Sequence, residues 1–135
     1  MMSLISTPIP ATTRPLQALL VLRILMALFF LFLAGKNLSG DVTMATDFQR
    51  WGYSDGFRML TAVLQILGAV LLLWPQTIFL GAVCLTLILV GATLTHFRYD
   101  PPAAMITPLA FLLPMLIFAW VHRPVGLFGS LGNSQ

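Results

Sequence analysis

Four long apolar runs, almost free of charge, fill most of the chain and restrict it to folds that lie in a membrane. The runs are roughly Leu16–Ala34, Phe57–Trp74, Ile78–Phe97 and Ala103–Val121. Each is long enough to cross a hydrocarbon core of about 30 Å as a helix of about 20 residues. Arg23 is the only formal charge well inside a run. The sequence therefore predicts an all-α integral membrane bundle of four helices, with both termini on one side.

The composition leaves room for this bundle and little else. Only 8% of the 135 residues are charged and the mean hydropathy is +0.94, values typical of a membrane protein. The net charge of +3 comes from scattered side chains, without a basic stripe or an acidic tail. We therefore expect the lipid bilayer as the main partner, and no nucleic acid.

The two ends differ in composition from the apolar middle. Residues 1–15 hold three prolines and several hydroxyl side chains, which predicts a flexible lead-in. The four-helix domain is then expected over 16–124, and a tail over 125–135. A secretory signal could be cleaved after Ala34, but Arg23 interrupts its apolar stretch, which is also too long for a typical signal. We therefore expect the first span to be retained.

Residues 40–56 form the one substantial polar segment between the runs. Apolar side chains recur there at helical spacing, at Met44, Phe48 and Trp51. This pattern predicts a short amphipathic helix lying in the membrane interface. Trp51 and Tyr53 are aromatic types that favour headgroup depth. Asp55 stands where a carboxylate favours the N-terminus of the second span.

Short connections and small residues predict how the spans pack. Trp74–Thr77 is so short that the second and third spans must form an antiparallel hairpin. Close helix contacts are predicted at three pairs of small residues, Gly68-Ala69, Gly81-Ala82 and Gly91-Ala92. Leu89 could face lipid, so we expect a large side chain at Gly91 to be more damaging than truncation of Leu89.

Polar side chains inside the spans are the first candidates for a functional site, because lipid leaves them without hydrogen-bond partners. Arg23 could extend toward the terminal side, or face the bundle and bind a carbonyl or an anionic group. Gln65 could bond to a neighbouring helix or contact a ligand. His96, near the end of the third span, could be structural or functional. Cys84, the only cysteine, lies among apolar neighbours and is expected to serve packing.

Polar residues of the spans and of the connections converge on one side of the membrane. We predict a capped pocket between the helices there, opening toward the first and third connections. Its expected ligand-binding residues are Arg23, Lys36, Trp51, Tyr53, Gln65, His96 and Arg98. The sequence shows no catalytic set, metal-ligand spacing, phosphate-binding loop or haem-type histidine pair. It therefore predicts neither a metal site nor catalytic residues.

Several stretches resemble the DoxX family of small bacterial membrane proteins, in particular its DoxX-like branch. The stretches are Leu22–Ala27, Ala34–Lys36, Trp51–Tyr53, Leu64–Pro75 and Val90–His96. The resemblance covers about Leu16 to Pro124, and it implies a four-helix bundle in the bacterial inner (cytoplasmic) membrane. Family members often have glutamate where Gln65 stands. The amide of Gln65 does not titrate, which argues against a role in proton transfer.

The resemblance implies function more coarsely than fold. Members resemble the small subunit of a thiosulfate:quinone oxidoreductase, and others associate with redox-defence proteins. We therefore expect an accessory subunit of a quinone-linked redox system, which binds a small amphipathic ligand such as a quinone or a lipid. A soluble or membrane redox protein would be its partner, with a homo-oligomer as a further candidate assembly. Two alternatives stay open: a catalytic quinone oxidoreductase subunit, and an assembly factor for other membrane proteins.

Overall fold

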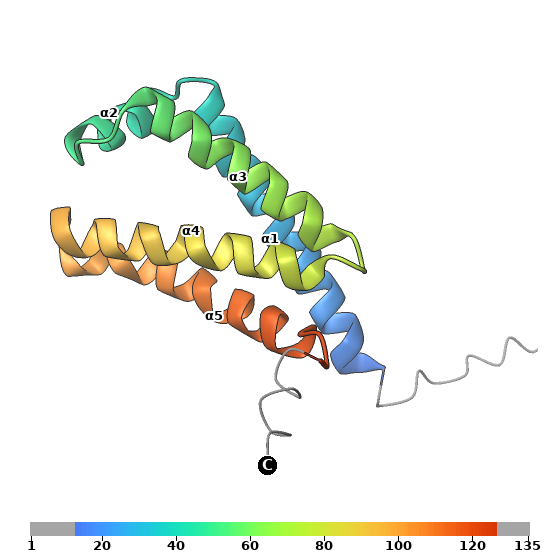
Figure 1. The fold of residues 1–135 in the computed structure, drawn as a ribbon. Helices are drawn as coiled ribbons and strands as arrows, with labels where there is room; N and C mark the ends of the chain where they lie inside the picture. The colour runs from blue at the N-terminus through green and yellow to red at the C-terminus, as the bar shows by residue number, and fades with distance from the viewer. Residues whose placement is uncertain (1–12, 127–135) are drawn as a thin grey trace, which may run out of the picture.

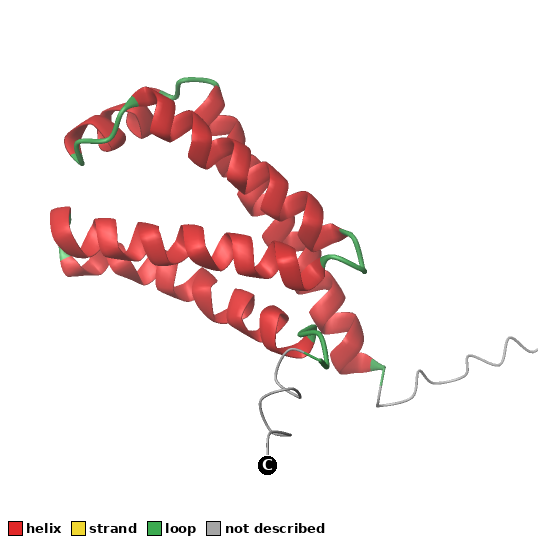
Figure 2. Cartoon of the chain, in the orientation of Figure 1, coloured by secondary structure: helices red, strands yellow, loops and turns green. Residues whose placement is uncertain are grey.

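The computed structural model describes residues 13–126, which are helical almost throughout (Figure 2). In chain order the elements are α1 (Arg14–Leu38), α2 (Val42–Arg50), α3 (Asp55–Leu73), α4 (Ile78–Tyr99), the 3-10 helix η1 (Pro102–Met105) and α5 (Ile106–Val121). This part of the chain contains no strand. The predicted all-α class is confirmed.

Four of these helical segments are long and apolar enough to cross a membrane. They are α1, α3, α4 and the continuous segment Pro102–Val121. With nine residues, α2 is too short to cross. The prediction of a four-span integral membrane protein is therefore confirmed. Most of the expected lead-in, and residues 127–135 of the expected tail, lie outside the described residues.

The helix ends follow from local chemistry. Pro15 lies in the first turn of α1, where its missing N–H costs no hydrogen bond. The Asp41 carboxylate accepts from the backbone N–H of Met44 and begins α2. Ser54 caps α3 in the same way. The connections on either side of α2 each contain a glycine with positive φ, at Gly40 (+71°) and Gly52 (+81°). The short helix predicted in the polar segment is therefore confirmed as α2.

The helices form two pairs that meet at one end and diverge at the other (Figure 1). In sequence order α1 packs against α3, α3 against α4, and α4 against α5. We call the end that holds the start of α1, the turn at 74–77 and the end of α5 the terminal end. The opposite end, which holds α2 and the link at 100–101, is the loop end. The predicted hairpin of the second and third spans is confirmed as α3 and α4.

The core lies where the pairs meet, and glycine makes the closest contact there. A Cβ atom on Gly81 would stand 2.4 Å from the backbone nitrogen of Leu72 and 2.8 Å from the carbonyl oxygen of Gly68. The backbones of α3 and α4 therefore touch at this point, and the predicted contacts at Gly68 and Gly81 are confirmed. The buried core around them consists of Ala27, Phe30, Ala69, Leu72, Ile78, Ala82, Leu85, Leu89, Met115 and Phe118.

The contact predicted at Gly91 is wrong. A Cβ atom there would have no neighbour within 4 Å, whereas Leu89 is only 4% exposed and belongs to the core. The physical reason is the divergence of the two helix pairs toward the loop end. Small residues near the loop end of α4 border open space, so their size does not indicate a helix contact.

Candidate functional site

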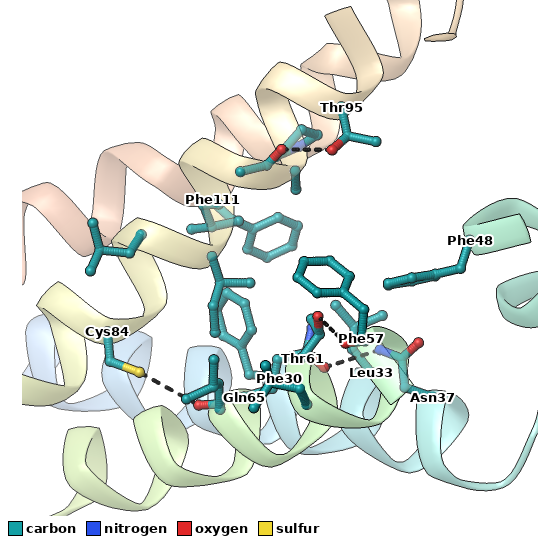
Figure 3. Close-up of a pocket in the computed structure, with 18 of the residues that line it drawn as sticks. Phe30, Leu33, Asn37, Phe48, Phe57, Thr61, Gln65, Cys84, Thr95 and Phe111 are labelled. Atoms are coloured by element: carbon teal, nitrogen blue, oxygen red, sulfur yellow. Dashed lines mark hydrogen bonds between the residues drawn. The ribbon is translucent and has the colours of Figure 1, made fainter. Parts of the chain in front are cut away.

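The divergence of the helices leaves one large cavity, with a volume of about 770 Å³, in the loop-end half of the bundle. All five α-helices contribute to its wall. Most of the wall is apolar, and it includes the aromatic rings of Phe30, Phe57 and Phe111 (Figure 3). The ring of Phe29 belongs to the same wall. The rings of Phe29 and Phe111 stack with centroids 4.0 Å apart and join α1 to α5. The cavity therefore has a rigid aromatic side, which suits a flat or extended apolar ligand.

A buried polar cluster lies where α1 packs against α3, and two of its members, Asn37 and Gln65, line the cavity. Asn37 donates from Nδ2 to Oε1 of Gln65 over 3.1 Å (Figure 3). Arg58 donates from Nη1 to the backbone carbonyl of Asn37. The three residues are 3–6% exposed. The helix-to-helix bond considered for Gln65 is confirmed, and it leaves the Oδ1 atom of Asn37 buried without a protein partner.

Asp100 gathers the polar contacts that hold the α2 segment over the cavity. Its Oδ1 accepts from Nη1 of Arg50 at 2.5 Å, and its Oδ2 accepts from Nε1 of Trp51 at 3.1 Å. The Nδ1 atom of His96 lies 2.7 Å from the same Oδ2. The Arg50 guanidinium, aided by His96 and Trp51, holds the pKa of Asp100 below its usual range. The bonds to Asp100 and Asp47 in turn raise the pKa of Arg50.

Aromatic contacts complete this cap, which we define as residues 48–53. The ring of Phe48 lies 5.5 Å from that of Trp51 and 6.0 Å from that of Tyr53. Trp51 meets His96 edge to face at 5.2 Å. The hydroxyl oxygen of Tyr53 lies 2.9 Å from Oγ1 of Thr95 on α4. The cap therefore joins α3 to the loop end of α4 through side chains, across the divergence of the backbones.

The match to a family model decides which kind of protein this is. The model of the DoxX-like family matches residues 21–118, and this segment includes every residue that lines the cavity. The chain belongs to the DoxX-like family. No curated protein and no solved structure matches it.

Four of the seven expected ligand-binding residues of this DoxX-like protein lie along the cavity: Trp51, Tyr53, Gln65 and His96. The other three do not line it. Lys36 pairs with Asp41 at 3.7 Å, and the guanidinium of Arg98 lies over the ring of Tyr99. Both point away because residues one or two positions apart on a helix do not share a face: Lys36 precedes Asn37 by one residue, and Arg98 follows His96 by two.

The expected placement of Arg23 in this pocket is wrong. Arg23 lines a second, smaller cavity near the terminal end, together with Phe118 and Val121 of α5 and His122 directly after it. The reason is its position on α1, because it precedes Phe29, the first residue of α1 that lines the large cavity, by six residues, and Asn37 by fourteen.

Sequence reasoning missed three polar residues of this DoxX-like protein that organise the site: Asn37, Arg58 and Asp100. A signal for two of them was present. Arg58 precedes Gln65 by seven residues and shares its helix face, and Asp100 follows His96 by four. Asn37 gave no such signal, because its partner is on another helix. Cys84 packs as expected, with Sγ 3.6 Å from the carbonyl oxygen of Leu64, and it also borders the cavity.

The described residues hold no group of three or more histidine, cysteine, aspartate or glutamate side chains that could bind a metal ion. The site offers shape and hydrogen bonds to a ligand. The amide nitrogen of Gln65 makes no hydrogen bond to another described residue, and it borders the cavity. The Oδ1 atom of Asn37 also lacks a partner, but it is fully buried. The amide nitrogen of Gln65 can therefore donate to a ligand that carries a carbonyl group.

Proposed function

We propose that this protein is an accessory subunit of a quinone-linked redox system in the bacterial inner membrane, and that its cavity binds a small amphipathic ligand. The observation that carries the proposal is the cavity itself. Its volume of about 770 Å³ lies within the range of small-molecule sites, about 300–1,000 Å³. A largely apolar wall with a few polar groups is the pattern of such sites. A quinone or a lipid has matching chemistry.

The polar groups of the cavity favour a quinone or quinol over a plain hydrocarbon. The free amide nitrogen of Gln65 can donate to a carbonyl oxygen. Because the Asp100 carboxylate is an acceptor only, it accepts from Nδ1 of His96, so in the neutral ring Nε2 is an acceptor for a hydroxyl. The cavity thus presents a donor to an oxidised ring and an acceptor to a reduced one.

The position of the cavity favours entry from the bilayer. Its border includes side chains of α3 and α4 that are half or more exposed, such as Leu60 (52%) and Leu87 (67%), so the cavity is open between these helices. A ligand dissolved in lipid can therefore reach it between these helices. The cap, with its partly exposed Arg50 and the neighbouring Asp47, would be the surface where a redox partner binds.

Titration with a short-chain ubiquinone tests the binding step. We expect saturable quenching of tryptophan fluorescence, because Trp51 borders the cavity. Gln65→Leu and His96→Leu should each weaken binding by about fivefold, the value of one hydrogen bond of about 1 kcal/mol. The double variant should lose less than the product of both effects, because the two residues share a site. Gln76→Leu is the matched control, because Gln76 is exposed in the turn at the terminal end.

A lipid extract of the gently purified protein tests whether the ligand is present in the cell membrane. Mass spectrometry should find a quinone or a lipid in stoichiometric amount, and a redox protein should co-purify. Unchanged quinone binding in both leucine variants would refute the ligand site. Retention of many unrelated membrane proteins, with no quinone bound, would favour an assembly factor instead.

A further inference from the structure

The charges of this protein are divided unequally between its two ends. All four acidic residues of the sequence, Asp41, Asp47, Asp55 and Asp100, lie at the loop end, where each pairs with a basic side chain. The terminal end carries Arg14, Arg23 and Arg123, and no acidic side chain. The sequence outside the described residues contains no aspartate or glutamate either. The sequence therefore contains no acidic side chain that is left to pair with the terminal-end arginines.

Arg23 is the terminal-end arginine that most needs a partner. It lies within the membrane-spanning helix α1, and its Nε atom is buried without a hydrogen-bond partner. Among the described residues the guanidinium makes no hydrogen bond or ion pair. By contrast, Arg123 donates to the carbonyl oxygen of Trp120 over 2.9 Å and stacks on its ring at 3.8 Å. An unpaired guanidinium in a membrane is costly, so we expect Arg23 to bind a polar partner beyond the described residues.

Arg23 faces a crevice between α1 and α5, with a volume of about 110 Å³. The apolar part of the crevice includes Leu16 and Leu20 of α1 and Phe118 of α5. Its volume is below that of sites for drug-sized ligands, so it suits a single small group. Leu16 and Leu20 are 66% and 46% exposed, which leaves an apolar surface beside the crevice where an acyl chain can lie.

The backbone of Arg23 lies below the headgroup level, inside the membrane-spanning helix α1, so only its side chain can approach the lipid phosphates. Arg23 lies nine residues from the start of α1, about 14 Å along the helix axis. Side chains on a helix lean toward its N-terminus, and the long arginine side chain extends further the same way. The crevice residues of α1 all precede Arg23, in agreement with this direction. The guanidinium therefore reaches toward the headgroups of the leaflet at the terminal end.

His122 gives the crevice a second polar wall. Its Nδ1 atom lies 3.0 Å from the carbonyl oxygen of Phe118 and must carry the proton, which fixes the ring orientation. The other ring nitrogen is left to accept from a headgroup hydroxyl or, when the ring is charged, to donate to a phosphate oxygen.

We propose that this crevice binds a phosphate-type oxyanion, either the phosphodiester of an anionic phospholipid or a free phosphate. The planar guanidinium of Arg23 would bind two phosphate oxygens at once, an arrangement that arginine favours. Basic pockets between membrane helices are known to hold anionic headgroups. The site is separate from the large cavity, because the two share no lining residue. It therefore does not depend on the proposed quinone function.

Lipid competition tests the site on the full chain in a mild non-ionic detergent. Native mass spectrometry would compare phosphatidylglycerol with phosphatidylcholine of the same acyl chains, added in equal amounts. We expect about a fivefold preference for phosphatidylglycerol, as one basic residue near a membrane surface provides. Arg23→Gln should reduce the preference to near one, and Arg23→Lys should retain part of it. Arg98→Gln is the control, because it removes the same charge from an exposed site at the loop end.

Two further measurements keep the result decisive. Leu20→Trp retains the arginine but narrows the crevice, so it should lower the preference even if Arg23→Gln does not fold. Inorganic phosphate, matched in ionic strength by chloride, should raise the melting temperature in an Arg23-dependent way if the natural ligand is a free anion, and leave it unchanged if only a lipid fits. An equal loss in Arg98→Gln, or no preference in the unmodified protein, would overturn the site.

Discussion

The terminal end and the loop end of this bundle are built on opposite principles. At the terminal end α3 and α4 touch through their backbones at Gly81 and Gly68. At the loop end the same helices stand apart around a cavity of about 770 Å³ (Figure 1). There the cap joins them through side chains, as in the bond between Tyr53 and Thr95. Small residues close one end, and aromatic and polar residues bridge the other.

The difference shows how a short membrane chain can hold a cavity without collapsing. Lipid provides little hydrophobic force to close the helices, so packing and hydrogen bonds decide where they meet. The glycine contact makes the terminal end a fixed hinge point. The cluster of Asn37, Gln65 and Arg58 keeps α1 on α3 beyond the hinge, and Asp100 holds the cap on α4. The loop end can thus stay open and still be ordered.

The two glycines of α4 provide the sharpest test of this contrast. Gly81→Ala should lower the free energy of unfolding by about 3 kcal/mol, the upper range for overpacking, because its Cβ atom would strike the backbone of α3. Gly91→Ala should be neutral or stabilise by up to about 1 kcal/mol, because nothing lies within 4 Å and alanine favours helix. Unfolding in mixed detergent micelles, followed by circular dichroism, measures both. Equal losses would mean that the helices do not diverge.

The outline of the fold could be predicted from the sequence because lipid imposes strong and local requirements. Length and hydropathy alone located the four spans, and the brevity of 74–77 required the α3–α4 hairpin. The terminal-end contact was also predictable, since Gly68 and Gly81 lie near that short turn and must face each other. The contact expected at Gly91 was wrong because a small residue permits a helix contact but does not show that a partner helix lies beside it.

The candidate site was only half predictable. Gln65, His96 and the aromatic pair Trp51 and Tyr53 were expected together, because polar and aromatic types in a membrane protein gather at a few positions. The role of Asn37 depends on how α1 is rotated against α3, and no local pattern encodes that rotation. Arg23 was misplaced because it was expected to join the polar residues of the loop end. Its position in the first half of α1 places it nearer the terminal end.

The polar cluster at the loop end gives a smaller effect than the glycine contact. Asn37→Leu and Gln65→Leu should each cost about 1–2 kcal/mol, because each leaves a buried amide without its partner. The double variant should cost about 1 kcal/mol less than the sum. Thr61→Val is the control, since the Thr61 hydroxyl bonds only to the Phe57 carbonyl of its own helix, and a change below about 0.5 kcal/mol is expected. Additive losses would show that the two amides act separately.

The smallest expected effect is the response of the cap to acidic pH. The pKa of Asp100 is held below its ordinary value of about 3.9, chiefly by Arg50. The stabilisation that Asp100 gives to the cap is therefore fully present above about pH 4, and it is lost as the pH falls through the lowered pKa. We expect the emission of Trp51, measured after Trp74→Phe and Trp120→Phe, to shift to the red in that acidic range, because its Nε1 bond to Asp100 breaks.

Asp100→Asn decides whether this acid response belongs to the cap. It should show red-shifted Trp51 emission already at neutral pH and little further change on acidification, since the amide cannot replace the charged bond to Arg50. Asp55→Asn is the matched control, because Asp55 is exposed and makes no contact with Trp51. If both variants retain the acid transition of the parent, the response comes from the bundle as a whole. The loop end would then unfold with the terminal end, and the separation between a fixed hinge point and a held cap would fail.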